Sequence, residues 1–234
     1  MIGYTTYELQ SNCAAPRNII NHTDGTLSFV WTVGMGSTNA DPARGSGYNY
    51  WANGSLLLPA VSTRIETVRT GFSQIAVLGN GTKEVIFAHK DAPHDFQMST
   101  NTSLGSTTWT GIGSGASALL PQQGTTPTMG LWARIATGGT DGNSIHLLHG
   151  YTLNSGSAKG IITPNAYSRS TDAGQSWDDV SIMLPGYDST RVLDGSGEEY
   201  AIDADGNTVA IVYGGLDHDV ALWKSTDNGA TFTR

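Results

Sequence analysis

Ser170-Thr171-Asp172-Ala173-Gly174-Gln175-Ser176-Trp177 decides the fold of this chain, because a second copy of the same pattern lies near its end, at Ser225-Thr226-Asp227-Asn228-Gly229-Ala230-Thr231-Phe232. In each copy a serine is followed two positions later by an aspartate. A glycine stands two positions after the aspartate, and an aromatic residue stands three positions after the glycine. The aspartate can accept hydrogen bonds from turn N–H groups and from the serine hydroxyl, and the glycine can take a positive φ. The pattern therefore predicts a β-hairpin turn that recurs along the chain.

A second series of turns recurs at intervals of roughly sixty residues, which is a long repeat for a β architecture. Its members are Asp24-Gly25, Asn80-Gly81, Asp141-Gly142 and Asp205-Gly206, all typical of type I′ hairpins. A β-rich run follows each turn: Thr26 to Val33, Lys83 to His89, Ser144 to Tyr151 and Thr208 to Tyr213. The aromatic that closes the second hairpin of each unit follows the same rhythm, at Trp51, Trp109, Trp177 and Phe232. The spacing of these turns and aromatic residues therefore predicts four repeats, each with four strands.

We therefore expect an all-β protein, a β-propeller of four-stranded antiparallel blades with about four blades in the chain. We expect residues 1–234 to form a single propeller domain with approximate repeats 17–59, 69–121, 130–185 and 198–234, and residues 1–12 to be a possible ring-closing strand. The alternative is that the chain is part of a six-bladed propeller. In that case exposed strand edges and blade faces would favour a homo-oligomer.

Composition narrows the function classes. The net charge is -8 and only 14% of the residues are charged, which argues against nucleic acid as a partner. No stretch approaches the roughly 18 apolar residues of a membrane span, so we expect no membrane insertion. The single cysteine, Cys13, cannot form an internal disulfide, and the six histidines are scattered. We predict no metal site and no cofactor.

Superposition of the repeats on their turn glycines selects a set of candidate ligand residues. Eight residues before each glycine stand Arg17, Ser73, Arg134 and Glu198. Two arginines and a carboxylate then share one level of the innermost strands, which line the central channel. Arginine at this place suits an anionic ligand, because its planar fork can hold a carboxylate through two parallel hydrogen bonds.

The repeated turn resembles the Asp-box, or BNR repeat, of sialidase-like β-propellers. The residues that carry this resemblance are Ser170, Asp172, Gly174 and Trp177 in one copy and Ser225, Asp227, Gly229 and Phe232 in the other. Their acids belong to turns between the third and fourth strands, on the outer side of the blades. We therefore expect them to stabilise the turns and to take no part in catalysis.

Residues 68–82 resemble a sialidase motif in which an arginine precedes a strand, a Gly-Thr turn and a second strand. The resemblance implies that Arg69 matches the first of three arginines that hold the carboxylate of sialic acid. Val68 stands where that family has an aromatic residue, and Thr70-Gly71 where it has Ile-Pro. Sialidase chemistry also requires an acid/base aspartate and a tyrosine nucleophile activated by a glutamate. The catalytic candidates for these roles are Asp91, Tyr200 and Glu198.

A broader resemblance covers most of residues 2–232. Residues 2–10, 44–50, 64–66 and 69–72 look like secreted Asp-box propellers of Bacteroidetes, which implies an extracellular or cell-surface protein without an established catalytic activity. We therefore expect a noncatalytic module that binds a glycan or a surface protein at the channel mouth, through Arg17, Arg69, Arg134 and Glu198. The alternatives are an exo-sialidase or neuraminidase-like glycoside hydrolase and a structural surface scaffold.

Overall fold

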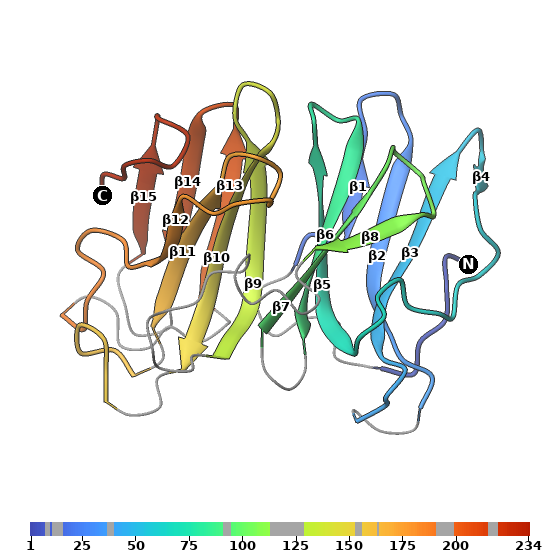
Figure 1. Ribbon diagram of the computed structural model, residues 1–234, viewed down its shortest axis with the longest axis horizontal. Coiled ribbons are helices and arrows are strands. Elements are labelled where there is room, and N and C mark those ends of the chain that lie inside the picture. The colour runs from blue at the N-terminus through green and yellow to red at the C-terminus, as the bar shows by residue number, and fades with distance from the viewer. Residues whose placement is uncertain are drawn as a thin grey trace.

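The computed structural model describes residues 1–7, 10, 16–36, 40–90, 95–112, 129–152, 156–162, 164–190, 199–214 and 220–234. These residues form fifteen strands in four antiparallel sheets and contain no helix (Figure 1). Within each sheet the strands lie in chain order, so each hairpin partner is also the neighbour in sequence. The prediction of an all-β propeller of antiparallel blades is confirmed.

Each sheet is one blade. Blade 1 contains β1 (Ile19–Asn21), β2 (Leu27–Val33), β3 (Gly45–Ala52) and β4 (Ser55–Leu56), and blade 2 contains β5 (Thr70–Leu78), β6 (Lys83–Lys90), β7 (Asp95–Asn101) and β8 (Trp109–Ile112). Blade 3 contains β9 (Met129–Gly138), β10 (Ser144–Thr152), β11 (Asn165–Ser170) and β12 (Asp179–Ile182), and blade 4 contains β13 (Tyr200–Asp205), β14 (Thr208–Tyr213) and β15 (Ala221–Ser225). In blade 4 a single bridge between Lys224 and Thr233 stands where a fourth strand would begin.

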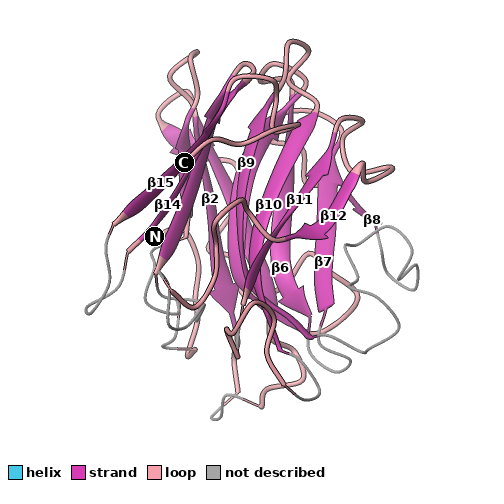
Figure 2. Cartoon of the chain, turned by 90° about the vertical axis from the view of Figure 1, so that its left-hand side faces the viewer, coloured by secondary structure: helices cyan, strands magenta, loops and turns pink. Residues whose placement is uncertain are grey.

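The core lies between the blades. Three clusters of buried apolar side chains fill the successive boundaries: blades 1 and 2, blades 2 and 3, and blades 3 and 4. The strands show which faces are covered. β6 is buried on both faces because blade 2 has a neighbour on each side, whereas β13, β14 and β15 alternate between buried and exposed residues. Figure 2 shows β14 and β15 on the side of the molecule that is farthest from blade 2.

The two repeated Ser-Asp-Gly turns have one geometry in blades 3 and 4. The hydroxyl of Ser170 donates to Asp172 Oδ1 (2.9 Å), and its oxygen accepts the N–H of Gly174 (2.8 Å). Asp172 in turn accepts the N–H (2.8 Å) and the hydroxyl (2.5 Å) of Ser176. Blade 4 repeats the same bonds through Ser225, Asp227, Gly229 and Thr231, at 2.6 to 2.9 Å. Both acids are thus engaged with their own turns.

These two turns and the equivalent turn of blade 2 also dock on the preceding blade through a glycine. Gly105, Gly174 and Gly229 all have positive φ, and a Cβ on each would collide with a third-strand side chain of the blade before it. The collisions would be with Tyr50 (2.6 Å), Met98 (2.3 Å) and Tyr167 (2.0 Å), respectively.

The following aromatic packs in the same direction. Trp109 meets Tyr48, Trp177 meets Phe87, and Phe232 meets Tyr167, all edge to face. Trp51 differs from the expected pattern, because it lies inside β3 and the turn to β4 is Asn53-Gly54 beyond it. In blade 1 a type I′-like turn with two positive φ values replaces the aromatic-flanked one.

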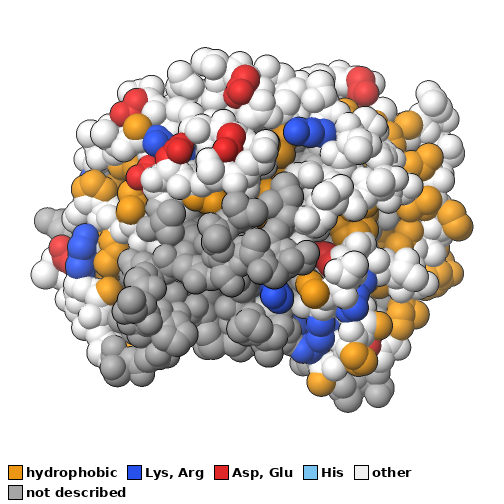
Figure 3. All heavy atoms as spheres, viewed as in Figure 1, with side chains coloured by type: hydrophobic (Ala, Val, Ile, Leu, Met, Phe, Trp, Pro, Cys, Tyr) orange, Lys and Arg blue, Asp and Glu red, His pale blue; other side chains and the backbone are white. Residues whose placement is uncertain are grey.

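The N-terminal residues lie against blade 1. The N–H of Tyr4 donates to the carbonyl of Val61 (2.8 Å), and that of Thr6 to the carbonyl of Gly34 (2.7 Å). Exposed apolar side chains of this part of the chain include Ile2, Tyr4 and Leu57. Figure 3 shows apolar side chains gathered at the blade 1 end of the face in view. Residues 1–7 thus pack against the first blade, and closure of the last blade by residues 1–12 stays a prediction.

Candidate functional site

A cavity of about 280 Å³ lies where the innermost strands meet. Its walls come from all four blades: the segment before β1, β5, β9 and β13. The lining residues are Pro16, Arg17, Gln74, Arg134, Ile135, Tyr200, Ala201 and Ile202. A concave site that is built by every blade in the chain is the place where a propeller of this kind can hold a ligand.

Arg134 places a buried cation in this cavity. The residue is 6% exposed, and its guanidinium carbon lies 5.7 Å from the centre of the Tyr200 ring. Nη1 donates to the carbonyl of Ala133 at 2.9 Å. Burial lowers the pKa of Arg134, and Tyr200 acts in the opposite direction. Arginine remains protonated at neutral pH even so, so the cavity wall carries a positive charge.

Gln74 adds a hydrogen-bond donor on the β5 side. Its Oε1 accepts the N–H of Ile135 at 3.3 Å, which fixes the amide across the boundary between blades 2 and 3. Its Nε2 is buried and has no hydrogen-bond partner in the part of the chain that the structure describes. A buried donor without an acceptor costs about 1–3 kcal/mol. A ligand acceptor that bonded to this nitrogen would remove that cost.

Arg17 joins the two ends of the blade series. Its Nη2 lies 2.8 Å from Oδ1 of Asp203 on β13, and the two side chains are 39% and 73% exposed. An ion pair at this exposure contributes about 0–1 kcal/mol to stability. The guanidinium can therefore be shared with a ligand at small cost.

The structure shifts the predicted level of the site by one residue in blade 2. Arg17 and Arg134 both line the cavity, but in β5 the lining residue is Gln74 instead of Ser73, whose hydroxyl lies 2.6 Å from that of Ser46. The turn between β5 and β6 spans residues 79–82 and that between β9 and β10 spans residues 139–143. Because the β5–β6 turn is one residue shorter, counting eight residues back from its glycine gives Ser73, one residue before the position that is equivalent to Arg134. Sequence reasoning missed Gln74 for this reason.

Arg69 lies apart from the cavity. Its Nε donates to the backbone carbonyl of Asp41 at 3.0 Å, and it is not among the lining residues. Burial, together with the nearby Arg44, lowers the pKa of Arg69. The Asp41 carboxylate accepts three backbone N–H groups of its own loop, those of residues 35, 36 and 43. Arg69 thus belongs to the packing between blades 1 and 2 and is not brought together with Arg17 and Arg134.

Tyr200, a candidate nucleophile, forms part of the cavity wall. It is 3% exposed, and its hydroxyl donates to the carbonyl of Trp132 at 2.5 Å. Burial raises the pKa of Tyr200 far above its usual value. A phenol that is buried and already bonded is a poor nucleophile. Asp91 and Glu198, the other catalytic candidates, lie outside the described residues.

No group of three or more His, Cys, Asp or Glu side chains is placed to hold a metal ion within the described ranges. The same ranges contain no helix of the length and hydropathy required to cross a bilayer.

No protein-family model matches this sequence, and no curated protein sequence matches it. Several solved structures are similar in fold. Zg3597, a family 117 glycoside hydrolase of Zobellia galactanivorans, has a TM-score of 0.50 and 11% identity, with 93% of this chain and 67% of that chain covered. A PL25 ulvan lyase has a TM-score of 0.53 and 11% identity, with 92% and 53% covered.

The catalytic domain of a GH62 α-L-arabinofuranosidase of Coprinopsis cinerea has a TM-score of 0.50 and 13% identity, with 99% and 70% covered. The chain thus spans about half the length of the lyase and about two thirds of the two hydrolases. At these identities the likeness concerns the fold. The chain is a β-propeller similar to those of carbohydrate-active enzymes.

Proposed function

We propose that this protein is an exported, sialidase-like Asp-box propeller that binds an acidic glycan in the cavity between its innermost strands, without turning it over. The observation that carries the proposal is that Gln74, whose buried Nε2 has no hydrogen-bond partner among the described residues, lines the same cavity as Arg134 and Arg17. All three side chains offer donors to this space. A ligand group with several acceptor oxygens, such as a carboxylate or a sulfate, complements them.

A role without catalysis fits the chemistry of Tyr200. The only catalytic candidate among the described residues uses its hydroxyl on a backbone carbonyl, and its high pKa keeps the phenol protonated at neutral pH. Arg134 lies over the Tyr200 ring, and Gln74 accepts the N–H of Ile135. Side chains that are already placed by such contacts suit recognition of one fixed group, because less side-chain entropy is lost on binding.

A glycan is favoured over a surface protein by the size and shape of the site. A cavity of about 280 Å³ holds one sugar ring and its acidic substituent, whereas protein partners bind over flat surfaces of some 800 Å². The fold neighbours are named for hydrolysis or cleavage of saccharides, and the ulvan lyase was solved with -[GlcA(1-4)Rha3S]- bound. An extracellular or cell-surface place for the protein would give it access to such polymers.

The test is calorimetric titration with sialyllactose, glucuronate-containing oligosaccharides and their neutral counterparts. We expect saturable binding of an acidic ligand, and at least a tenfold loss of affinity on Arg134→Gln, since a charge-assisted hydrogen bond contributes about 1.5–3 kcal/mol. Gln74→Glu keeps the oxygen that accepts the N–H of Ile135 but turns the donor into an acceptor. It should therefore abolish binding of an anion.

Lys224→Gln is the matched control, because it removes one positive charge from an exposed position on β15. It should leave the affinity unchanged. Equal affinity of wild type and Gln74→Glu would refute the cavity as the binding site. Release of the chromophore from an aryl sialoside would instead refute the noncatalytic assignment.

A further inference from the structure

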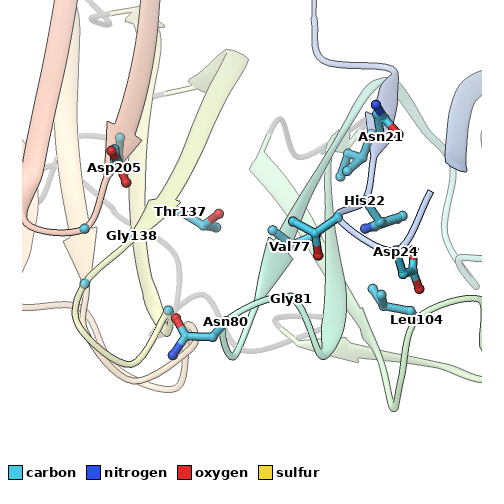
Figure 4. A pocket seen from close by; sticks show the side chains of 16 residues that line it. Asn21, His22, Asp24, Val77, Asn80, Gly81, Leu104, Thr137, Gly138 and Asp205 are labelled. Carbon is cyan, nitrogen blue, oxygen red and sulfur yellow. The ribbon is translucent and has the colours of Figure 1, made fainter. Parts of the chain in front are cut away.

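A second, larger pocket lies at the opposite ends of the innermost strands. It has a volume of about 400 Å³ and is formed by the hairpin turns that connect the first and second strands of all four blades (Figure 4). We propose that this pocket, the turn-side pocket, binds a neutral, hydroxyl-rich ligand of the saccharide class, with His22 as its principal acceptor. It would be a site separate from the cavity of Arg134 and independent of the proposed function.

A buried chain of hydrogen bonds places the ring hydrogen of His22 on Nε2. Its Nε2 lies 2.7 Å from the hydroxyl oxygen of Ser28, and that hydroxyl donates its own proton to Oε1 of the fully buried Glu84. Because the serine proton is used on the carboxylate, Nε2 must donate to the serine oxygen. In the neutral form of the ring, the other nitrogen, Nδ1, then carries a lone pair.

His22 lies between the buried Ser28–Glu84 pair and the turn-side pocket. His22 is 7% exposed and lines the pocket, while its Nε2 edge faces the interior between blades 1 and 2. Nδ1 and Nε2 are separated by one ring carbon and point away from each other, so Nδ1 is directed away from Ser28, and we assign it as the atom that His22 presents to the pocket it lines. Figure 4 shows the His22 ring in the pocket wall next to Val77 and Asp24. A hydroxyl group in the pocket can donate to this nitrogen.

The rest of the lining suits the same kind of ligand. Asp205 adds carboxylate oxygens as acceptors, and Asn80 and Thr137 add groups that both donate and accept. Val77 and Leu104 provide an apolar surface for the C–H face of a sugar ring. None of the lining residues is Lys or Arg, in contrast to the cavity of Arg17 and Arg134. Carboxylates without cations disfavour an anion, so the two pockets select ligands of different charge.

The experiment follows backbone amide shifts by NMR during titration with glucose, galactose and cellobiose. We expect saturable shifts at Gly81, Gly139 and Gly206, which line the turn-side pocket. His22→Gln places an amide N–H where Nε2 donates to Ser28 and removes the Nδ1 acceptor, so it should weaken binding about fivefold to tenfold. Asp205→Asn should weaken it about threefold. Asp141→Asn should not change it, because Asp141 lies on the β9–β10 turn but is not among the residues that line the pocket.

Three results would overturn the proposal. They are the absence of shifts at these glycines up to 100-fold excess of each sugar, binding of putrescine but of no sugar, and unchanged sugar affinity in a folded His22→Gln or Asp205→Asn. If His22→Gln does not fold, Asp205→Asn and Thr137→Val decide the question, because both lie at the pocket surface. Acidic glycans report on the other cavity, so failure of one site is distinguishable from failure of the other.

Discussion

The docking turns of blades 3 and 4 differ from that of blade 2 in their polar frame. In blades 3 and 4 a serine and an aspartate organise the turn, whereas blade 2 has Asn101 and Ser103 at the equivalent places. Asn101 bonds to Glu84 instead, with Oδ1 accepting its N–H (2.7 Å) and Nδ2 donating to its Oε2 (2.6 Å). All three turns nevertheless insert a positive-φ glycine against the preceding blade.

The comparison shows which part of the motif defines the architecture. The glycine and the aromatic set how one blade meets the next, and they persist where the serine and aspartate are absent. The acid is a local means of holding the loop in shape, and a buried carboxylate on a neighbouring strand can replace it. Variants at these positions should therefore differ in their effects on stability.

The largest effect is expected for Gly229→Ala. A Cβ there would lie 2.0 Å from the hydroxyl of Tyr167 and 3.0 Å from Nδ1 of His146, at a φ of +78°. Overpacking and backbone strain together should lower the free energy of unfolding by about 3 kcal/mol. Gly25→Ala has a similar φ (+82°) and open space around it, so it should cost about 1 kcal/mol. Equal losses in urea denaturation would show that contact with blade 3 is unimportant.

Glu84→Gln should follow. The carboxylate accepts the hydroxyls of Ser28 and Tyr48 (2.7 Å to the latter) and the amide of Asn101, and it is fully buried. An amide offers one acceptor oxygen in place of two and adds an N–H₂ group that faces donors. We expect a loss of about 2 kcal/mol in thermal or chemical unfolding. A variant as stable as the wild type would mean that this network does not replace the serine and aspartate that organise the turns of blades 3 and 4.

Asp172→Ala should have the smallest effect, a loss of roughly 1 kcal/mol with glycan binding intact, because its bonds lie at the edge of the blade. Burial raises the pKa of Asp172, but hydrogen bonds from Ser176 and Ser170 outweigh it and leave the pKa below normal. A carboxyl group whose pKa is lower in the folded than in the unfolded protein stabilises the fold at pH values above its unfolded pKa. This stabilisation is lost as the pH falls through the pKa of the folded state. The difference between wild type and variant should thus shrink in acid. A folded variant without binding would contradict the structural role.

Local sequence signals predicted much of this fold, but they could not predict contacts between residues that are far apart in the chain. The turn glycines and the runs after them gave the second strands to within a residue or two, since hairpin chemistry is local. The place of Gln74 depended on the lengths of turns in different blades. The pairing of Glu84 with Ser28 and Tyr48 joins residues 36 to 56 apart in the chain, and no pattern in one strand specifies its partner in the next blade.

The docking contacts have a direction. Gly105, Gly174 and Gly229 each rest on a blade that lies earlier in the sequence, and so do Trp109, Trp177 and Phe232. When a ribosome synthesises this chain from the N-terminus, every docking turn emerges after the surface that receives it. Each finished blade can then serve as the template for the next, and assembly can proceed in step with translation.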